Sequence, residues 1–565
     1  MASAENGDFP DKQRIQVEPK MRSINLDKVL EDEVGAFGWF QKRVILLAGL
    51  LVVFVSWSNN EYVFTTARIP TRCHIPECDL EEPEFHSEWL PSAIPGSAAA
   101  LDGCQRFGAA NASAARADAC PPDWFDRDRL ESCERHLYEN TDTVVYDFDL
   151  ACDEWRRALI GSMKVFGMLL GVPLTGYVSD RFGRRTAAVI TAVNCAWIGI
   201  LRFFANTYIG FIISVFAETA FGSAYTTVFI LMMEIVGPKF RVGVGATMTS
   251  FFSIGQMIMA LIAWGVPNWK HLTLALFAPQ FITIAYFWLL PESFRWYMSR
   301  GRYEESQNVL KKIAKVNKKT LSEKSLIALK QFGEEEKARQ EKLKEQSKNE
   351  PWLIVLVFRH KPILIRCLVS PIWWITTTFI YYGLTINAVN MSGNRFVRFV
   401  NYIAVMAAQI PGYWSAVFLI EKIGRKPALI TAFWLCAACQ IGYIIMPEGQ
   451  YALSLTLYLA GTYCISNVVT AVYSYTAELY PTKYRNSLFA FSSTMGRIGS
   501  ILAPLTPALG AAVWDKLPFA LFAGLACLSG ALVFVTPETR GTKFPDTMEE
   551  ASQLGRNNKR TSTRL

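Results

Sequence analysis

The sequence predicts an all-α polytopic membrane protein in which twelve transmembrane helices form two six-helix pseudo-repeats. Three observations predict this fold. Apolar residues gather into twelve blocks of about 20 residues, the length that crosses roughly 30 Å of hydrocarbon. Lys and Arg residues stand mainly in the short connections between these blocks, as in cytoplasmic loops. Short charged motifs also recur at an offset near 240 residues.

The first 43 residues are rich in polar and charged side chains and contain no early apolar block, so we expect a cytoplasmic location and no cleavable signal peptide. The first apolar block, at about 44–64, then serves as a signal anchor. Backbone polar groups inside a bilayer must bond to one another, so each block is expected to be a helix. The N-terminal half spans 44–290, and its other blocks are at about 158–179, 187–205, 208–233, 243–265 and 272–290.

A long connection, 65–157, joins the first two predicted helices. It is rich in Asp, Glu and Cys and contains the sequon Asn111-Ala112-Ser113. We therefore expect an extracellular loop that is glycosylated at Asn111 and closed by disulfides. The candidate disulfide residues are Cys73, Cys78, Cys104, Cys120, Cys133 and Cys152. Six cysteines allow about 15 pairings, and the sequence does not choose among them.

A second long connection, 291–361, is full of Lys, Glu, Gln and Arg and contains no cysteine. It predicts a cytoplasmic helical linker. The C-terminal half follows at 362–536, with blocks at about 362–386, 398–420, 428–446, 451–475, 487–512 and 517–536. A tail at 537–565 ends the chain. Twelve spans with one large outer loop predict a multi-pass membrane protein with both termini in the cytoplasm.

The sequence contains no motif that is typical of an enzyme active site. The five histidines lack metal-ligand spacing, and neither a GxSxG motif nor a Walker lysine motif occurs. We expect no enzyme activity, no cofactor and no metal. The net charge of +8 does not predict nucleic-acid binding, because the basic residues follow the apolar blocks.

Charged motifs close corresponding helices in the two halves. Gly183-Arg184-Arg185 follows the second helix, and Gly424-Arg425-Lys426 follows the eighth. A parallel repeat of this kind places the substrate between the halves. We expect a charged clasp that holds the halves together in one conformation and breaks in the other; exposed ion pairs worth under about 1 kcal/mol are the alternative. The expected gating residues are Asp180, Arg181, Arg184, Arg185, Glu234, Arg241, Arg425, Glu478 and Arg485.

Several motifs carry a family resemblance. The stretch from Gly176 to Arg185 resembles the loop signature of the major facilitator superfamily. The segments 291–297, 477–486 and 537–541, with the cysteine-rich first loop, resemble solute carrier family 22, the organic cation, organic anion and carnitine transporters. The resemblance runs from about Leu26 to Glu550. It implies the major facilitator fold and transport of small organic ions by alternating access.

Arg497 lies inside the eleventh predicted helix, where a charge costs at least about 2.5–3.5 kcal/mol unless it meets a partner. At the matching position the family's cation transporters carry Asp, whereas its anion and carnitine transporters carry Arg. We expect Arg497 to hold a substrate carboxylate through a two-pronged hydrogen bond. A structural ion pair, for example with Glu218, is the alternative.

Aromatic and polar residues complete the predicted substrate site. Tyr413 and Tyr225 resemble the carnitine type of the family, and an aromatic face there could accept an ammonium group. Helix packing or a place in an interfacial aromatic belt is the alternative for each aromatic residue. Glu218 is expected to pair with Arg202, Lys164 or Arg497, or to bind a coupling ion. The further candidates for substrate binding are Trp374, Tyr381, Tyr382, Gln256 and Asn59.

We therefore expect a plasma-membrane transporter of carnitine-like zwitterions or organic anions. A zwitterion gains nothing from the membrane potential, so concentrating it requires a coupled sodium ion or proton, or exchange. One alternative is an organic cation transporter that uses Glu218, and another is a non-transporting receptor on a carrier fold. The expected partners are the small organic ion and the lipid bilayer; the oligomeric state stays open.

Overall fold

A computed structural model describes residues 29–554, except 80–82, 98–99, 111–119, 324, 328, 332–333, 335–337, 339–351, 391–394, 448, 543–544 and 546. The described chain is mostly helical, and the predicted all-α membrane fold is confirmed. In its described part, ten helical stretches are long and apolar enough to cross a membrane. The other two predicted spans are a helix interrupted near Pro504 and a shorter apolar helix of 17 residues, Leu517–Val533.

The N-terminal half contains six helical spans in chain order. They are α2 (Trp39–Asn60) with α3 (Tyr62–Thr65), α6 (Glu154–Phe182), α7 (Arg184–Leu201) with η3 (Arg202–Phe204), α8 (Tyr208–Phe221) with α9 (Tyr225–Ile235), η4 (Pro238–Phe240) with α10 (Arg241–Gly265), and α11 (Trp269–Phe277) with η5 (Ala278–Ala285) and α12 (Tyr286–Leu289).

The fourth span differs from the continuous helix that the sequence predicts. Gly222, Ser223 and Ala224 separate α8 from α9. A Cβ at Gly222 would lie 2.7 Å from the Cβ of Cys195, so glycine permits close packing against α7 here. A Gly-Ser pair is a common site of a helix break.

The C-terminal half repeats the arrangement. Its spans are α17 (Lys361–Asn387), α18 (Arg395–Ile423), α19 (Arg425–Ile445), α20 (Tyr451–Leu479), α21 (Arg485–Leu502) with η7 (Ala503–Leu505) and α22 (Thr506–Val513), and α23 (Leu517–Val533). Proline inside η7 removes a backbone donor and interrupts the eleventh span.

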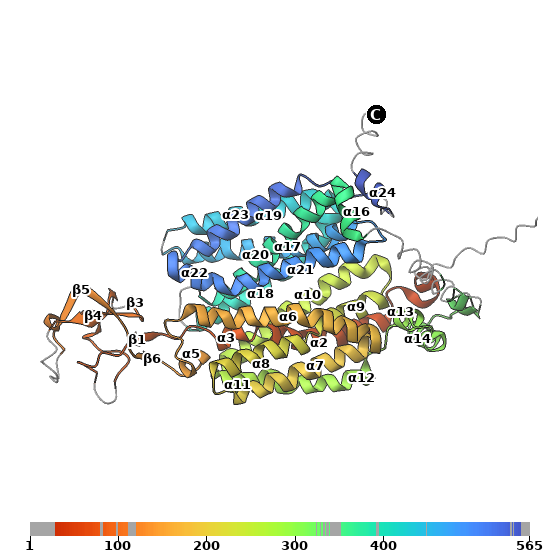
Figure 1. Cartoon of the computed structure of the whole chain (residues 1–565). Helices are drawn as coiled ribbons and strands as arrows, with labels where there is room; N and C mark the ends of the chain where they lie inside the picture. The colour runs from red at the N-terminus through yellow and green to blue at the C-terminus, as the bar shows by residue number, and fades with distance from the viewer. Residues whose placement is uncertain are drawn as a thin grey trace, which may run out of the picture.

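Figure 1 shows the two halves as bundles lying side by side, with the strands at one end and the short helices α13, α14, α16 and α24 at the other. We call these the strand-bearing end and the linker end. The halves meet mainly along α10 and α18, and along α6 with α21, η7 and α22. Any site between the halves therefore lies among these helices.

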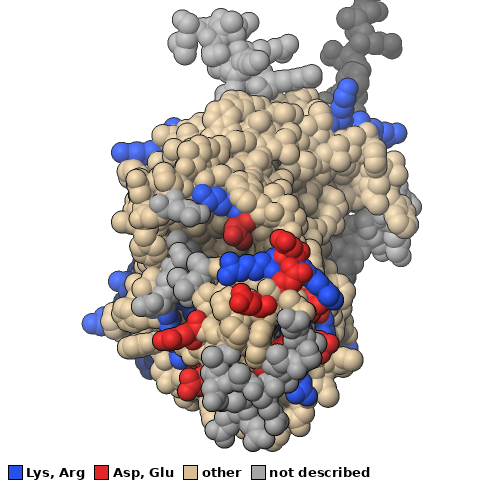
Figure 2. All heavy atoms as spheres, turned by 90° about the vertical axis from the view of Figure 1, so that its left-hand side faces the viewer, with Lys and Arg blue, Asp and Glu red and all other residues tan. Residues whose placement is uncertain are grey.

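The described residues of the strand-bearing end form three antiparallel strand pairs. These are β1 (Thr71–Cys73) with β6 (His136–Tyr138), β2 (Gly96–Ser97) with β3 (Ala100–Leu101), and β4 (Gln105–Ala109) with β5 (Phe125–Ser132). The short helices α4 (Leu90–Ala93), η2 (Pro122–Trp124) and α5 (Val144–Asp147) accompany them. Figure 2 looks onto this end and shows acidic side chains interspersed with basic ones on the visible face.

Three disulfides join the predicted cysteines of this loop. They pair Cys73 with Cys133, Cys78 with Cys120 and Cys104 with Cys152. The predicted disulfides are thus present, and the structure supplies the pairing that the sequence leaves open. The glycosylation candidate Asn111 lies outside the described residues.

The linker end is built from short helices. They are η1 (Leu30–Gly35), which has π-helical hydrogen bonding, α13 (Phe294–Ser299), α14 (Tyr303–Val316), α16 (Leu353–Arg359) and α24 (Met548–Gln553). Leu30 and Val34 of η1 pack with Leu310 and Ile313 of α14 in one buried apolar cluster. The segment before the first span is therefore fastened to the predicted linker.

Candidate substrate site between the two halves

Arg497 lies on α21 and reaches toward the other half. Its Nη1 is 3.3 Å from Sδ of Met168 on α6, and its side chain is half-buried. Among the described residues, no carboxylate forms a salt bridge with this guanidinium. A methionine sulfur is only a weak acceptor, so most of the donor capacity of Arg497 stays unused.

Two glycines of α21 set the direction of the arginine. A Cβ at Gly499 would lie 2.2 Å from the carbonyl oxygen of Ile375 on α17, and one at Gly496 would lie 3.1 Å from the Cβ of Trp374. These close contacts turn one face of α21 onto α17. Arg497 projects from a different face, toward α6 and the boundary between the halves.

A second polar group stands at the same boundary. The side-chain oxygen of Gln409 on α18 accepts hydrogen bonds from Ser253 of α10 at 2.8 Å, from Tyr381 at 3.0 Å and from Tyr413 at 3.2 Å. The hydroxyls of Tyr381 and Tyr413 are 2.9 Å apart. Within the described chain, the buried Nε2 of Gln409 has no partner. The three hydrogen bonds to its oxygen fix the side chain of Gln409, and its N–H group is therefore free to donate to a ligand.

Sequence reasoning missed Gln409, although a signal was present. The residue stands four positions before Tyr413, on the same face of a predicted helix. Amide side chains inside apolar helices need partners, and that need could have marked it.

The predicted aromatic residues form a wall near Arg497. Tyr382 packs edge-on against Tyr381 at 5.3 Å, and Tyr225 lies within electrostatic reach of Tyr413, Tyr382 and Tyr473. Tyr473, which sequence reasoning did not single out, lies close enough to Arg497 for the two side chains to interact electrostatically. Arg497 and the tyrosines are thus brought to one region.

Trp374 supports this wall from behind. Its indole nitrogen donates to Thr476 at 3.1 Å, and its ring lies 4.5 Å from that of Tyr473. The side chain is buried. It therefore positions Tyr473 and Gly496 by packing.

Gln256 and Asn59 occupy other positions. The side-chain oxygen of Gln256 on α10 accepts a hydrogen bond from Tyr402 of α18 at 2.9 Å, which joins the two halves. Asn59 is half-buried on α2, and its side chain makes no hydrogen bond within the described chain. Within the described chain, neither Gln256 nor Asn59 forms a hydrogen bond with Arg497.

Glu218 belongs to a buried network of four charges. Its carboxylate lies 3.0 Å from Lys164 and bonds to Arg202. Glu61, which sequence reasoning missed, lies 3.1 Å from Lys164 and also bonds to Arg202. All four side chains are buried, and two positive charges balance two negative ones. Arg497 takes no part in these ion pairs, so the pairing of Glu218 with Arg497 is not observed.

The predicted gating residues form corresponding clusters in the two halves. In the N-terminal half, Arg184 lies 2.6 Å from Asp180 and 3.4 Å from Glu234. In the C-terminal half, Arg425 lies 2.9 Å from Glu478. Each of these ion pairs stays within one half, so in this structure they do not form the expected clasp between the halves. The short reach from a helix end to the adjacent helix of its own bundle accounts for this.

Two further glutamates cap the same turns. Glu292 accepts hydrogen bonds from the backbone N–H groups of Arg184 at 2.8 Å and Arg185 at 3.2 Å. Glu538 accepts from those of Arg425 at 3.1 Å and Lys426 at 2.9 Å. A carboxylate at a helix N-terminus satisfies unpaired donors and complements the helix dipole.

The other predicted gating residues surround these clusters. Arg181 donates to the hydroxyl of Tyr177 at 2.8 Å, and the guanidinium of Arg185 lies 4.6 Å from the ring centre of Phe287. Arg241 begins α10. Arg485 begins α21, and its Nη2 donates to Thr482 at 3.2 Å.

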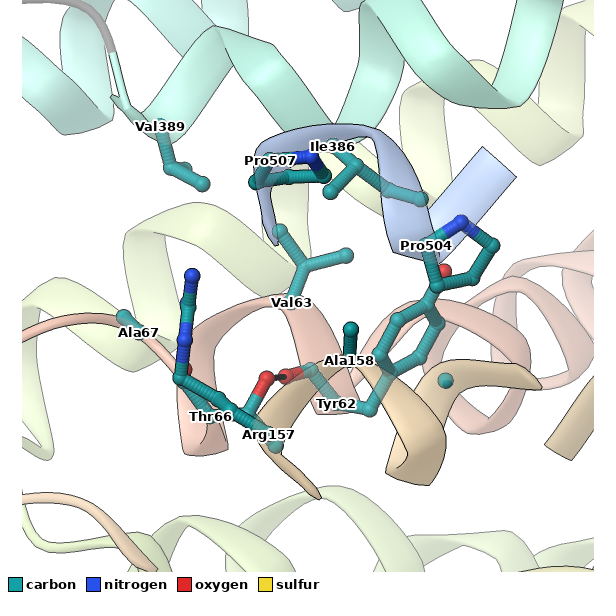
Figure 3. A pocket seen from close by; sticks show the side chains of 11 residues that line it. Tyr62, Val63, Thr66, Ala67, Arg157, Ala158, Ile386, Val389, Pro504 and Pro507 are labelled. Carbon is teal, nitrogen blue, oxygen red and sulfur yellow. Dashed lines mark hydrogen bonds between the residues drawn. The ribbon is translucent and has the colours of Figure 1, made fainter. Parts of the chain in front are cut away.

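The strand-bearing end is closed between the halves. Figure 3 shows a small cavity there, and its volume of about 30 Å³ has room for roughly one water molecule. A Cβ at Gly161 of α6 would lie 2.7 Å from Tyr62 and 2.8 Å from Pro504, which shows how tightly this seal is packed. Ser162 also donates to the carbonyl of Ile501 at 2.8 Å.

Contacts between the halves continue along α10 and α18. Phe64 stacks on Phe399 at 5.2 Å near the seal. Further toward the linker end, Trp414 donates to Ser250 at 3.2 Å. The Arg184–Glu234 and Arg425–Glu478 ion pairs lie beyond this contact, at the linker end, and each joins two residues of the same half.

Comparisons with known proteins agree with this architecture. The sequence profile of the sugar (and other) transporter family matches residues 92–551. The chain is 30% identical to organic cation/carnitine transporter 2 of Homo sapiens over 538 residues, which covers 92% of this chain and 93% of that protein. It is 29% identical to solute carrier family 22 member 3 of Mus musculus, with coverage of 93% and 95%. The inward-open structure of the xylose transporter XylE from E. coli superimposes with a TM-score of 0.58 at 14% identity, over 90% of this chain and 99% of that one.

Proposed function

The chain belongs to the sugar (and other) transporter family of the major facilitator superfamily and, within it, to solute carrier family 22, and from that membership we propose that it carries carnitine-like zwitterions or organic anions by alternating access. The resemblance seen in the sequence is confirmed. The protein is a multi-pass membrane transporter of small organic ions and not an enzyme. The observation that carries the finer proposal is the guanidinium of Arg497, which meets the sulfur of Met168 and forms no salt bridge with any described carboxylate.

A half-buried arginine at membrane depth costs at least about 2.5–3.5 kcal/mol when it lacks a partner. A substrate carboxylate would supply two parallel hydrogen bonds and the opposite charge. The amide hydrogens of Gln409, whose oxygen is already occupied by three donors, offer a further donor to the same anionic group.

The tyrosines favour a positively charged group at the other end of the substrate. Tyr225, Tyr382, Tyr413 and Tyr473 approach one another, and their ring faces carry partial negative charge. An ammonium group beside these rings and a carboxylate beside Arg497 describe a zwitterion of the carnitine type.

An organic cation transporter that uses Glu218 is supported less well. Both Glu218 and Glu61 are already paired with Lys164 and Arg202 in a neutral network. Recruiting Glu218 for a cationic substrate would leave buried positive charge without a counter-ion, which is costly.

The proposed orientation places the strand-bearing end outside the cell and the linker end, with both termini, in the cytoplasm. Three disulfides require an oxidising compartment, and the Lys and Arg residues gather at the linker end. In this orientation the structure is closed toward the outside. We propose the plasma membrane as the location and a sodium ion, a proton or an exchanged solute as the coupled species.

The test is uptake of radiolabelled carnitine, an organic anion and a permanent cation by cells that express the protein, with and without sodium. We expect uptake of one of the two carboxylates, with at least about tenfold loss in Arg497→Ala and partial retention in Arg497→Lys at equal surface expression. Uptake of the permanent cation alone would refute the substrate class. Binding without flux would support a non-transporting receptor.

A further inference from the structure

The residues just before the first transmembrane span form a strap, Val29–Ala36, that lies on the linker helix α14. Leu30 and Val34 of the strap are fully buried, and they pack in one cluster with Leu310 and Ile313 of α14. The strap is thereby fixed to a segment almost 300 positions away in the sequence. Its attachment also determines how the start of α2 is held.

Polar contacts centre on Asn317, the residue that follows α14. Its Nδ2 donates to the carbonyl of Val34 and to the side-chain oxygen of Gln41, both at 3.0 Å. Its Oδ1 accepts from the backbone N–H of Phe40 at 3.0 Å. Lys319 adds a hydrogen bond to the carbonyl of Asp32 at 2.9 Å. The strap, the first span and the linker share one network.

Glu33 of the strap extends this network by accepting hydrogen bonds from two serines. Its carboxylate accepts from the backbone N–H of Ser322 at 2.9 Å, from the hydroxyl of Ser322 at 3.2 Å and from the hydroxyl of Ser325 at 2.6 Å. Partial burial alone would raise the pKa of Glu33, but the hydrogen bonds from Ser325 and Ser322 outweigh it and hold the pKa below its usual value. Glu33 is therefore ionised at neutral pH.

We propose that Ser322 is a phosphorylation site for a basophilic serine/threonine kinase, and that its modification releases the strap from α14. Ser322 is exposed, and Lys318 and Lys319 stand four and three positions before it. Ser325 is buried, so Ser322 is the accessible member of the pair. The kinase transfers the γ-phosphoryl group of ATP to Oγ of Ser322, its base takes the hydroxyl proton, and ADP leaves.

The phosphate changes the charge at the contact point. It adds a charge of about −1.5 to −2 and removes the hydroxyl hydrogen that Ser322 donates to Glu33. Two anions then face one another where a donor faced an acceptor. The phosphate also attracts Lys319 away from Asp32. Both changes weaken the attachment of the strap.

The experiment uses the purified full-length protein, treated with a basophilic kinase and ATP after folding. Mass spectrometry locates the phosphate, and hydrogen exchange is followed on peptides covering residues 29–37. We expect phosphate on Ser322 and exchange that is faster by roughly fivefold or more in the strap. Ser322→Ala should abolish both changes, whereas Thr320→Ala, at an exposed neighbouring position, should keep both.

A second variant tests the repulsion between the phosphate on Ser322 and the carboxylate of Glu33. In Glu33→Gln the phosphate on Ser322 meets a neutral amide, so phosphorylation should accelerate exchange much less than in the unsubstituted protein. An unmodified Ser322, or a phosphorylated Ser322 with unchanged exchange in the strap, would overturn the proposal. Neither readout involves transport, so the result is independent of the proposed substrate.

Discussion

The ammonium group of Lys164 lies 3.0 Å from the carboxylate of Glu218, and the two side chains are 2% and 1% exposed. Removing one partner of such a pair leaves a buried charge without compensation, which typically costs about 3–5 kcal/mol. We predict that Lys164→Met lowers the thermal stability of the detergent-purified protein strongly. Thermal unfolding followed by fluorescence measures this effect.

The double variant Lys164→Met with Glu218→Gln is the matched control, because it removes one charge of each sign. It should be more stable than Lys164→Met alone. If the single variant were as stable as the starting protein, Lys164 and Glu218 would not form the buried pair described above.

A second prediction concerns Gln409. Gln409→Glu adds a carboxylate where the structure holds an amide among Ser253, Tyr381 and Tyr413. An added anion opposes a substrate carboxylate and favours a cation. We expect uptake of the carboxylate substrate to fall about tenfold, which corresponds to 1.4 kcal/mol, and uptake of a permanent cation to rise.

Gln409→Met serves as the control for this substitution, since it removes the polar group without adding charge. It should weaken carboxylate uptake without increasing cation uptake. Equal behaviour of the two variants would show that the charge at this position does not set selectivity.

A third prediction uses the correspondence between Arg184 and Arg425. Each pairs with the glutamate that ends another span of its own half, Glu234 at 3.4 Å and Glu478 at 2.9 Å. These pairs are partly exposed, so each contributes under about 1 kcal/mol to stability. We expect Arg184→Ala and Arg425→Ala to leave thermal stability nearly unchanged while lowering the maximum uptake rate several-fold, because they shift the balance of conformations.

Saturation kinetics at measured surface expression separate these quantities. Lys422→Ala is a suitable control, because Lys422 lies at the end of α18, three positions before Arg425, and outside the Glu478 pair. Uptake that changes as little in Arg425→Ala as in Lys422→Ala would exclude a gating role for Arg425.

Apolar patterning predicted the spans because a bilayer allows few alternatives for a block of 20 apolar residues. The break at Gly222 was not predictable, since it depends on contact with Cys195 of a neighbouring helix. Disulfide pairing likewise depends on the tertiary arrangement of the loop.

The residues of the candidate site and of the buried charge network also include some that were predictable from the sequence and some that were not. Arg497 was predictable because a lone charge in an apolar block is conspicuous in any sequence. Glu61 was not, because it stands near the end of its block, where a charge usually marks the membrane boundary. Only the fold brings Glu61 to Lys164 and Arg202.

A fourth prediction concerns the seal at the strand-bearing end. Gly161 packs so closely that an added Cβ would lie 2.7 Å from Tyr62 and 2.8 Å from Pro504. Gly161→Ala should therefore hinder closure of this end and favour the conformation open there.

Gly176 lies on the same helix, α6, and an added Cβ there meets nothing within 4 Å, so Gly176→Ala is the matched control. In a variant with Ala158→Cys, whose buried position lines the small cavity, Gly161→Ala should speed labelling by a membrane-impermeant maleimide, whereas Gly176→Ala should not. Equal labelling rates in the two backgrounds would mean that the Gly161 contact does not limit closure.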